Sequence, residues 1–168
     1  MSTYVIAHVE GQPDWNKIPT FSVDNILWLP DAGIRMSQQI CYDAEKLYIH
    51  QKAVEEYVRA EHTDVLAQVC EDSCMEFFFC PDASDDRYFN FEWNLHGALY
   101  LGWRTGRDQA VRLLLKDHKS LFNFCGAKTP DDWEIFYEIP ASCSHKMLST
   151  ENDGIIFQSG CPSVRIMI

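Results

Sequence analysis

The chain has 168 residues, the size of one domain, and 46% of them are hydrophobic, so it can bury a core and is not a disordered tail. Its 14 Lys and Arg against 25 Asp and Glu give a net charge of −11, which argues against a nucleic-acid backbone or an anionic membrane surface as the main partner. Neutral and cationic partners stay open.

The cysteine count and the first residues bear on the compartment. Seven Cys is an odd number, so at least one thiol is free or pairs with another chain, and the spacings lack the second pair of a zinc site. We interpret them as buried thiols in a reducing compartment. Residues 1–10 show no signal peptide, and no window approaches the ~18 apolar residues of a membrane span. We therefore expect a cytoplasmic protein without a membrane span, although a secreted chain with its signal removed would look the same.

Short alternating segments between Gly, Pro, Asn and Asp predict strands in the first part of the chain. The predicted elements are a strand at 4–9, a helical turn at 14–18 that ends at Pro19, and strands at 34–41 and 47–54. Residues 54–67 are the best candidate for a longer helix, with a mixed pattern.

The middle of the chain predicts an antiparallel meander of three strands, at 74–80, 88–94 and 98–103, joined by short turns. Later elements are a strand at 133–140, a short helix at 141–148 and a last strand at 154–158. The whole pattern predicts an all-β fold: one antiparallel, jelly-roll-like β-sandwich domain over residues 1–168 with one or two short helical turns.

Residues 88–94 separate into two faces by the period of two in a strand. Phe89, Phe91 and Trp93 form a core stripe, and the polar residues alternate with them. If the neighbouring strands pair, one sheet face collects Tyr48, His50, Glu76, Tyr88, Asn90, Glu92, Asn94 and Tyr100. Exposure to solvent alone also explains such a row. However, carboxylates, amides and aromatic rings without a basic cluster suit a sugar, whose hydroxyls donate and accept while its C–H faces stack on rings.

Several blocks of the sequence resemble the family-nine-like carbohydrate-binding domains, relatives of the DOMON sandwich. The central blocks are DSCMEFF at 72–78 and YFNFEWN at 88–94, the latter followed by Gly97. Weaker blocks are Trp15 to Pro19, Tyr42 to Ala60 and Trp133 to Pro140. The resemblance is strongest over residues 14–140, and residues 155–168 are atypical.

The resemblance implies a β-sandwich that binds mono- or oligosaccharides without cleaving them, in carbohydrate catabolism or beside a glycoside hydrolase partner. It also implies that Glu76, at the family's acidic position, hydrogen-bonds the sugar. In related modules two tryptophans clamp the sugar ring, and Cys70 stands where one of them is expected.

The remaining candidate residues extend this site. We expect Asn90, Glu92 and Asn94 to bind hydroxyls beside Glu76, with Arg59 or Arg87 at the rim. The candidate stacking residues are Tyr88, Tyr100 and Trp103. Trp28 and Trp133 are more typical of packing than of sugar platforms.

Three alternatives stay open. A glycoside-processing enzyme, an O-glycosyl hydrolase, would use the carboxylates of Glu76 and Glu92. A degenerate sandwich would serve protein–protein contact. The turn with Asp82, Asp85 and Asp86 has the oxygen ligands of a structural calcium site, as the related modules carry, and no other cofactor is expected.

Overall fold

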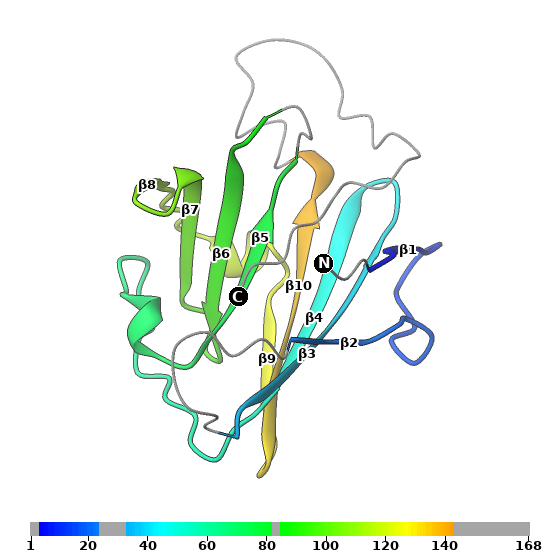
Figure 1. The fold of residues 1–168 in the computed structure, drawn as a ribbon, viewed down its shortest axis with the longest axis horizontal. Helices are drawn as coiled ribbons and strands as arrows, with labels where there is room; N and C mark the ends of the chain where they lie inside the picture. Colours follow the sequence, from blue (N-terminus) through cyan, green and yellow to red (C-terminus); the bar gives the residue numbers. More distant parts are fainter. Residues whose placement is uncertain (1–3, 24–32, 82–84, 143–168) are drawn as a thin grey trace.

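The computed structural model describes residues 4–23, 33–81 and 85–142, which form two packed β-sheets (Figure 1). The larger sheet has the order β1-β3-β4-β10-β9, with β2 paired to β3. Its strands are β1 (Ala7–His8), β2 (Phe21–Val23), β3 (Arg35–Tyr42), β4 (Lys46–Val54), β9 (Cys125–Lys128) and β10 (Asp132–Pro140). The smaller sheet has the order β5 (Cys74–Phe79), β6 (Tyr88–Asn94), β7 (Leu99–Gly106) and β8 (Gln109–Arg112). The predicted all-β sandwich is confirmed.

Helical structure is limited to short pieces among the described residues. They are the 3₁₀ turn η1 (Val69–Glu71), the helix α1 (His118–Leu121) and the helical residues 141–142. In the part of the chain that the structure describes, no helix is long and apolar enough to span a membrane.

The predicted meander is confirmed, and β8 extends it by one strand. Residues 54–67, the best but mixed candidate for a longer helix, form no helix, because the segment after the end of β4 at Val54 runs without regular structure and several of its N–H groups bind side chains. Ser73 accepts from Arg59 N–H, and Asp72 accepts from Glu61 N–H and His62 N–H. The sheets are antiparallel except for the short parallel pairing of β1 with β3. The predicted strand at 154–158, most of the predicted helix at 141–148, and Trp28 lie outside the described residues.

Aromatic side chains fill the space between the two sheets. Phe77, Phe91 and Trp93 come from the smaller sheet, and Trp133 and Tyr137 come from β10. All five are nearly or completely buried, which confirms the core stripe of β6 and the packing role of Trp133. Burying such large apolar surfaces is the main stabilising contribution to the fold.

One buried amide also joins the two sheets. Gln51 of β4 is fully buried, and its Nε2 donates to the backbone carbonyl of Glu76 in β5 at 3.0 Å. The Gln51 carbonyl oxygen accepts from the Tyr137 hydroxyl at 3.3 Å. Because a buried amide is costly unless it is hydrogen-bonded, this contact fixes β5, and with it Glu76, against the larger sheet.

Gly126 of β9 provides a test of the contact between β9 and the β6–β7 turn. A Cβ at this position would lie 2.2 Å from the backbone oxygen of Leu95. We expect Gly126→Ala to lower the free energy of unfolding by about 1–3 kcal/mol, as overpacking does. Gly106→Ala is the matched control, since a Cβ there meets nothing within 4 Å. Urea denaturation of both variants measures the difference, and equal stabilities would contradict this packing.

Candidate functional site

The outer face of the smaller sheet, meaning the face turned away from the core, gathers most of the predicted polar residues. Strand alternation and the cross-strand pairing place them side by side. The outer face carries Cys74, Glu76, Phe78, Tyr88, Asn90, Glu92, Asn94, Tyr100, Gly102, Arg104 and Arg112.

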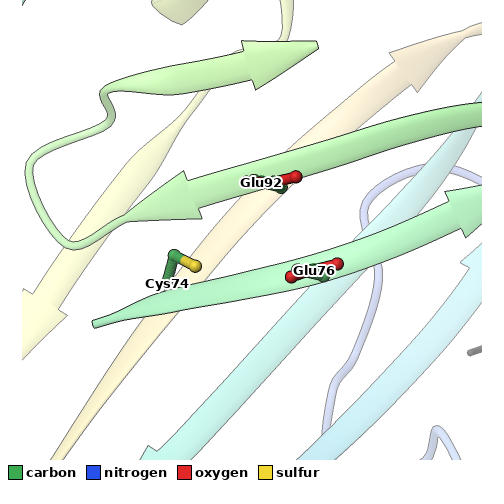
Figure 2. Close-up of side chains that lie close together, drawn as sticks. All are labelled: Cys74, Glu76 and Glu92. Atoms are coloured by element: carbon green, nitrogen blue, oxygen red, sulfur yellow. The ribbon is translucent and has the colours of Figure 1, made fainter. Parts of the chain in front are cut away.

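Two carboxylates lie at the centre of the outer face. Glu76 of β5 is the direct cross-strand partner of Glu92 of β6. The ligand atoms of Cys74, Glu76 and Glu92 all lie within 4.8 Å of one another. Figure 2 shows the three side chains on the same side of two neighbouring strands. Among the described residues, no side chain donates a hydrogen bond to the Glu76 carboxylate.

Burial and mutual repulsion shift the titration of this pair. Burial, and then the nearby charge of Glu92, raise the pKa of Glu76 to about 7. Burial also raises the pKa of Glu92, although the hydrogen bond from Asn90 and the charge of Arg104 oppose that rise. Since like charges in a half-buried site cannot both be well solvated, the pair retains a proton close to neutral pH. A protonated carboxyl donates a hydrogen bond and a carboxylate accepts one, so the pair offers a ligand both a donor and acceptors.

Asn90 and Tyr100 complete the centre of the outer face. The Asn90 amide donates to Glu92 Oε1 at 3.0 Å, while its own Oδ1 is buried without a hydrogen-bond partner among the described residues. Gly102 stands opposite Asn90, and the Tyr100 ring leans over it, 2.9 Å from where a Cβ would stand. Arg104 donates to the Tyr100 hydroxyl at 3.4 Å and lies 3.8 Å from Glu92 Oε1.

The segment 61–72 covers one end of the outer face. Asp72 accepts from the backbone N–H groups of Glu61 and His62 and from the Asn94 amide, and these bonds outweigh burial and lower its pKa. Arg112 of β8 donates to the carbonyl oxygens of residues 65–67. The turn η1, which carries Cys70, contacts β6. The place where the family's tryptophan is expected is therefore beside this face.

Two predicted ligand-binding residues have structural hydrogen bonds instead. Asn94 is fully buried, and its amide donates to His62 O and to Asp72, while its oxygen accepts from Ala98 N–H in the β6–β7 turn. Both of its N–H donors are therefore used inside the protein. Arg59 lies at the rim beside the start of β5, where it pairs with Glu61 at 3.1 Å and Asp72 at 3.8 Å.

The expected contribution of Tyr48 and His50 to this face is wrong. Both belong to β4, which pairs with β3 and β10 in the larger sheet. Tyr48 donates to Asp43, and His50 lies between Gln39 and Glu134. The alternation of β4 was interpreted correctly, but alternation does not say which sheet a strand joins.

Trp103 also differs from its predicted role beside Glu76. It shares the inner face of β7 with Leu101, and its ring packs on Phe89 with centroids 4.4 Å apart. Arg87 lies over the same ring at 5.3 Å and binds both carboxylate oxygens of Asp85. Trp103 and Arg87 therefore lie away from the acidic pair, whereas Tyr88 and Tyr100 are on its face.

The predicted calcium turn is described only in part, because Asp82 lies outside the described residues. The Asp85 carboxylate faces Arg87, which lowers the pKa of Asp85 through hydrogen bonds. Asp86 is exposed. The carboxylate of Asp85 thus already has a cationic partner, Arg87.

Phe78, Arg104 and Arg112 belong to the outer face but were not predicted there. Phe78 follows from the alternation that starts at Glu76, and its ring is 5.8 Å from that of Tyr88. Arg104 follows in the same way from Tyr100. Arg112 carries no such signal, because β8 is short and exposed. The two guanidinium groups lie 5.5 and 5.0 Å from the Tyr100 ring centroid, so the face carries two basic groups that the sequence did not place there.

Comparisons with known proteins bear on the family and the fold. The model of the family described as carbohydrate-binding family 9 matches residues 8–160. The fold is similar to an inferred carbohydrate-binding protein from Bacteroides uniformis ATCC 8492, with 24% identity and a TM-score of 0.71, covering 90% of this chain and 76% of that one. It is also similar to a family 9 module from Caldicellulosiruptor kristjanssonii in complex with cellotriose, with 11% identity and a TM-score of 0.50, covering 83% and 64%. A search of curated proteins found no match.

The raised pKa of Glu76 predicts a pH dependence of stability. A carboxyl whose pKa is about 7 in the folded chain and 4.5 unfolded binds more proton when folded, so its contribution is lost as pH rises through this interval. Relative to Glu76→Gln, the native chain should lose up to about 3 kcal/mol between pH 4.5 and about 7.5. Urea denaturation across this range measures the loss, with Glu56→Gln at an exposed position as the control. A difference in the free energy of unfolding between the native chain and Glu76→Gln that does not change with pH would contradict this prediction.

Proposed function

The chain belongs to carbohydrate-binding family 9, and we propose that it binds a mono- or oligosaccharide on the outer face of β5, β6 and β7. Carbohydrate binding without catalysis is the function of the family, and the proposal adds the place and the residues. It rests on the Glu76–Glu92 pair with Asn90, a polar cluster in which Asn90 and Glu92 are buried, Glu76 is partly exposed, and Asn90 Oδ1 has no hydrogen-bond partner among the described residues.

The chemistry of this cluster matches sugar hydroxyls. Half-buried polar groups cost free energy unless they are paired, so a ligand that donates and accepts hydrogen bonds relieves that cost. The acidic pair provides a donor and acceptors, and Asn90 Oδ1 provides a further acceptor. A sugar hydroxyl can donate a hydrogen bond to the acceptors of this cluster and accept one from its donor.

Aromatic rings flank this cluster on the same face. Phe78 and Tyr88 are half-buried neighbours on one side, and Tyr100 lies next to Glu92 on the other. Such rings offer apolar surfaces to the C–H groups of a sugar ring. Cys70 cannot stack in this way, so the stacking surface comes from the sheet itself.

The arrangement does not favour the hydrolase alternative. A glycoside hydrolase holds its two carboxyl groups on opposite sides of the scissile bond. Glu76 and Glu92 are instead adjacent on one side of the sheet, as Figure 2 shows. Both would contact the same side of a sugar.

The family resemblance also supports a setting in carbohydrate catabolism, with a glycoside hydrolase as partner. A domain that binds sugar without cleaving it would hold such an enzyme at its substrate. The binding site proposed here is a small patch of one sheet, which suits a single sugar ring or the end of a chain.

Glu76→Gln tests the site, because it keeps the size of the side chain and removes the ionisable group. We expect it to weaken sugar binding by at least about tenfold, the loss typical of hydrogen bonds to a charged group. Calorimetric titration with mono- and disaccharides, including glucose and cello-oligosaccharides, measures this, and the native chain should release no reducing sugar.

The matched control is Glu134→Gln on the outer face of the larger sheet. Glu134 lies there with His50, Phe136 and Trp15, which form a second aromatic and polar surface in the described part of the chain. Binding that survives Glu76→Gln and is lost in Glu134→Gln would move the site to that sheet.

A further inference from the structure

We propose that the preferred ligand is an amino sugar, a hexosamine with a free, protonated amino group, and that its ammonium lies between Glu76 and Glu92. This inference rests on the proposed function, since it names the class of sugar that the same site binds. Glu76 and Glu92 are cross-strand partners. Among the described residues, none donates a hydrogen bond to the carboxylate of Glu76, the more exposed of the two.

The spacing of the acceptors suits an ammonium nitrogen. Charge-assisted N–H···O bonds are about 2.8 Å long and the N–H bonds of an ammonium diverge by about 109°, so one nitrogen reaches two oxygens roughly 4.6 Å apart. One oxygen of Glu76 and one of Glu92 lie within 4.8 Å of one another. One ammonium group can therefore bind both carboxylates without a change in the backbone.

Asn90 provides an independent reason to expect a donor here. Its side chain is 1% exposed, and its amide contacts Glu92 Oε1 at 3.0 Å, so it reaches into the acidic pair. Its Oδ1 is an acceptor without a partner among the described residues. An ammonium group has three N–H donors, two for the carboxylates and a third for Asn90 Oδ1, which a rotation of the buried Asn90 side chain would have to expose.

The positive groups around the pair do not neutralise it. Arg104 is the nearest, 3.8 Å from Glu92, and it also donates to Arg107 O and to the Tyr100 hydroxyl. Arg112 is directed to the carbonyl groups of residues 65–67. Despite Arg104 and Arg107, the pKa of Glu76 stays at about 7. Burial is the main cause of this raised pKa and the charge of Glu92 adds to it, so a cation bound beside both carboxylates would lower it.

The groups facing the pair favour an ammonium over a metal ion. Burial and the two glutamates raise the pKa of Cys74, so its thiol stays protonated. A soft metal such as zinc binds the thiolate. The net charge of −11 also attracts a cationic ligand toward the protein.

The experiment compares amino sugars with their neutral parents by calorimetric titration of the whole chain at about pH 7. Glucosamine, galactosamine and mannosamine are each paired with glucose, galactose and mannose, so that ring stereochemistry does not decide the result. We expect at least one amino sugar to bind about tenfold more tightly than its parent, as an added charge-assisted hydrogen bond allows. N-acetylglucosamine, whose nitrogen is neutral, should show no advantage.

The outcomes separate this inference from the proposed function. Neutral sugars that bind as tightly as amino sugars overturn the amino-sugar preference and leave sugar binding intact. If no sugar binds, both fail. If the preference disappears in EDTA and returns with Zn²⁺, the cation is a metal ion and the inference is overturned.

Glu92→Gln tests the role of the charge directly. It keeps an oxygen for the Asn90 amide but removes one carboxylate, so both sugars should bind more weakly, and the amino sugar should lose more affinity than its neutral parent until the ratio of their affinities approaches one. Circular dichroism confirms folding. If this variant does not fold, Glu76→Asp provides the second test, because it retracts one carboxylate by a methylene and should reduce the advantage. An unchanged advantage in the folded variant would overturn the inference.

Discussion

The register between β5 and β6 is the constraint on which the rest of the structure depends. It places Phe77 opposite Phe91 on the inner face and Glu76 opposite Glu92 on the outer face. Because side chains alternate along a strand, a shift of either strand by one residue would turn its glutamate into the core and expose its aromatic rings. An unpaired charge in the core would cost several kcal/mol. Packing of the core thus brings two like charges together on the outer face.

Some polar residues in and around the outer face hold neighbouring segments in place, and others are available to bind a ligand. Asp72 and Asn94 use their hydrogen bonds to hold the segment 61–72 and the β6–β7 turn, while Gln51 holds β5 from beneath. The acidic pair and Asn90 Oδ1 keep unused capacity. Polar groups that lack protein partners, surrounded by residues that hydrogen bonds hold in place, are expected of a preorganised binding site.

The sequence predicted the faces of the strands and the local pairing of the meander, but not the pairing of strands that are distant in the chain. Alternation placed Glu76, Asn90 and Glu92 together because each strand of the meander leads to the next through a short turn. Alternation also placed Tyr48 beside these residues, and that placement was wrong. The strand of Tyr48, β4, pairs with β3 and with β10, which is distant in sequence. The strands β8 and β9 were missed for another reason. β9 is exposed throughout and β8 nearly so, and neither has a hydrophobic alternation to recognise. Residue type alone also could not tell that Asn94 is structural, since its partners His62 and Asp72 are far along the chain.

The most direct test of a sugar site on this sheet is an NMR titration of the ¹⁵N-labelled chain with a sugar that binds. The account predicts that shifts concentrate on the amides of β5, β6 and β7 around Glu76, Asn90 and Tyr100. Shifts concentrated instead on Trp15, His50 and Phe136, on the outer face of the larger sheet, would contradict it.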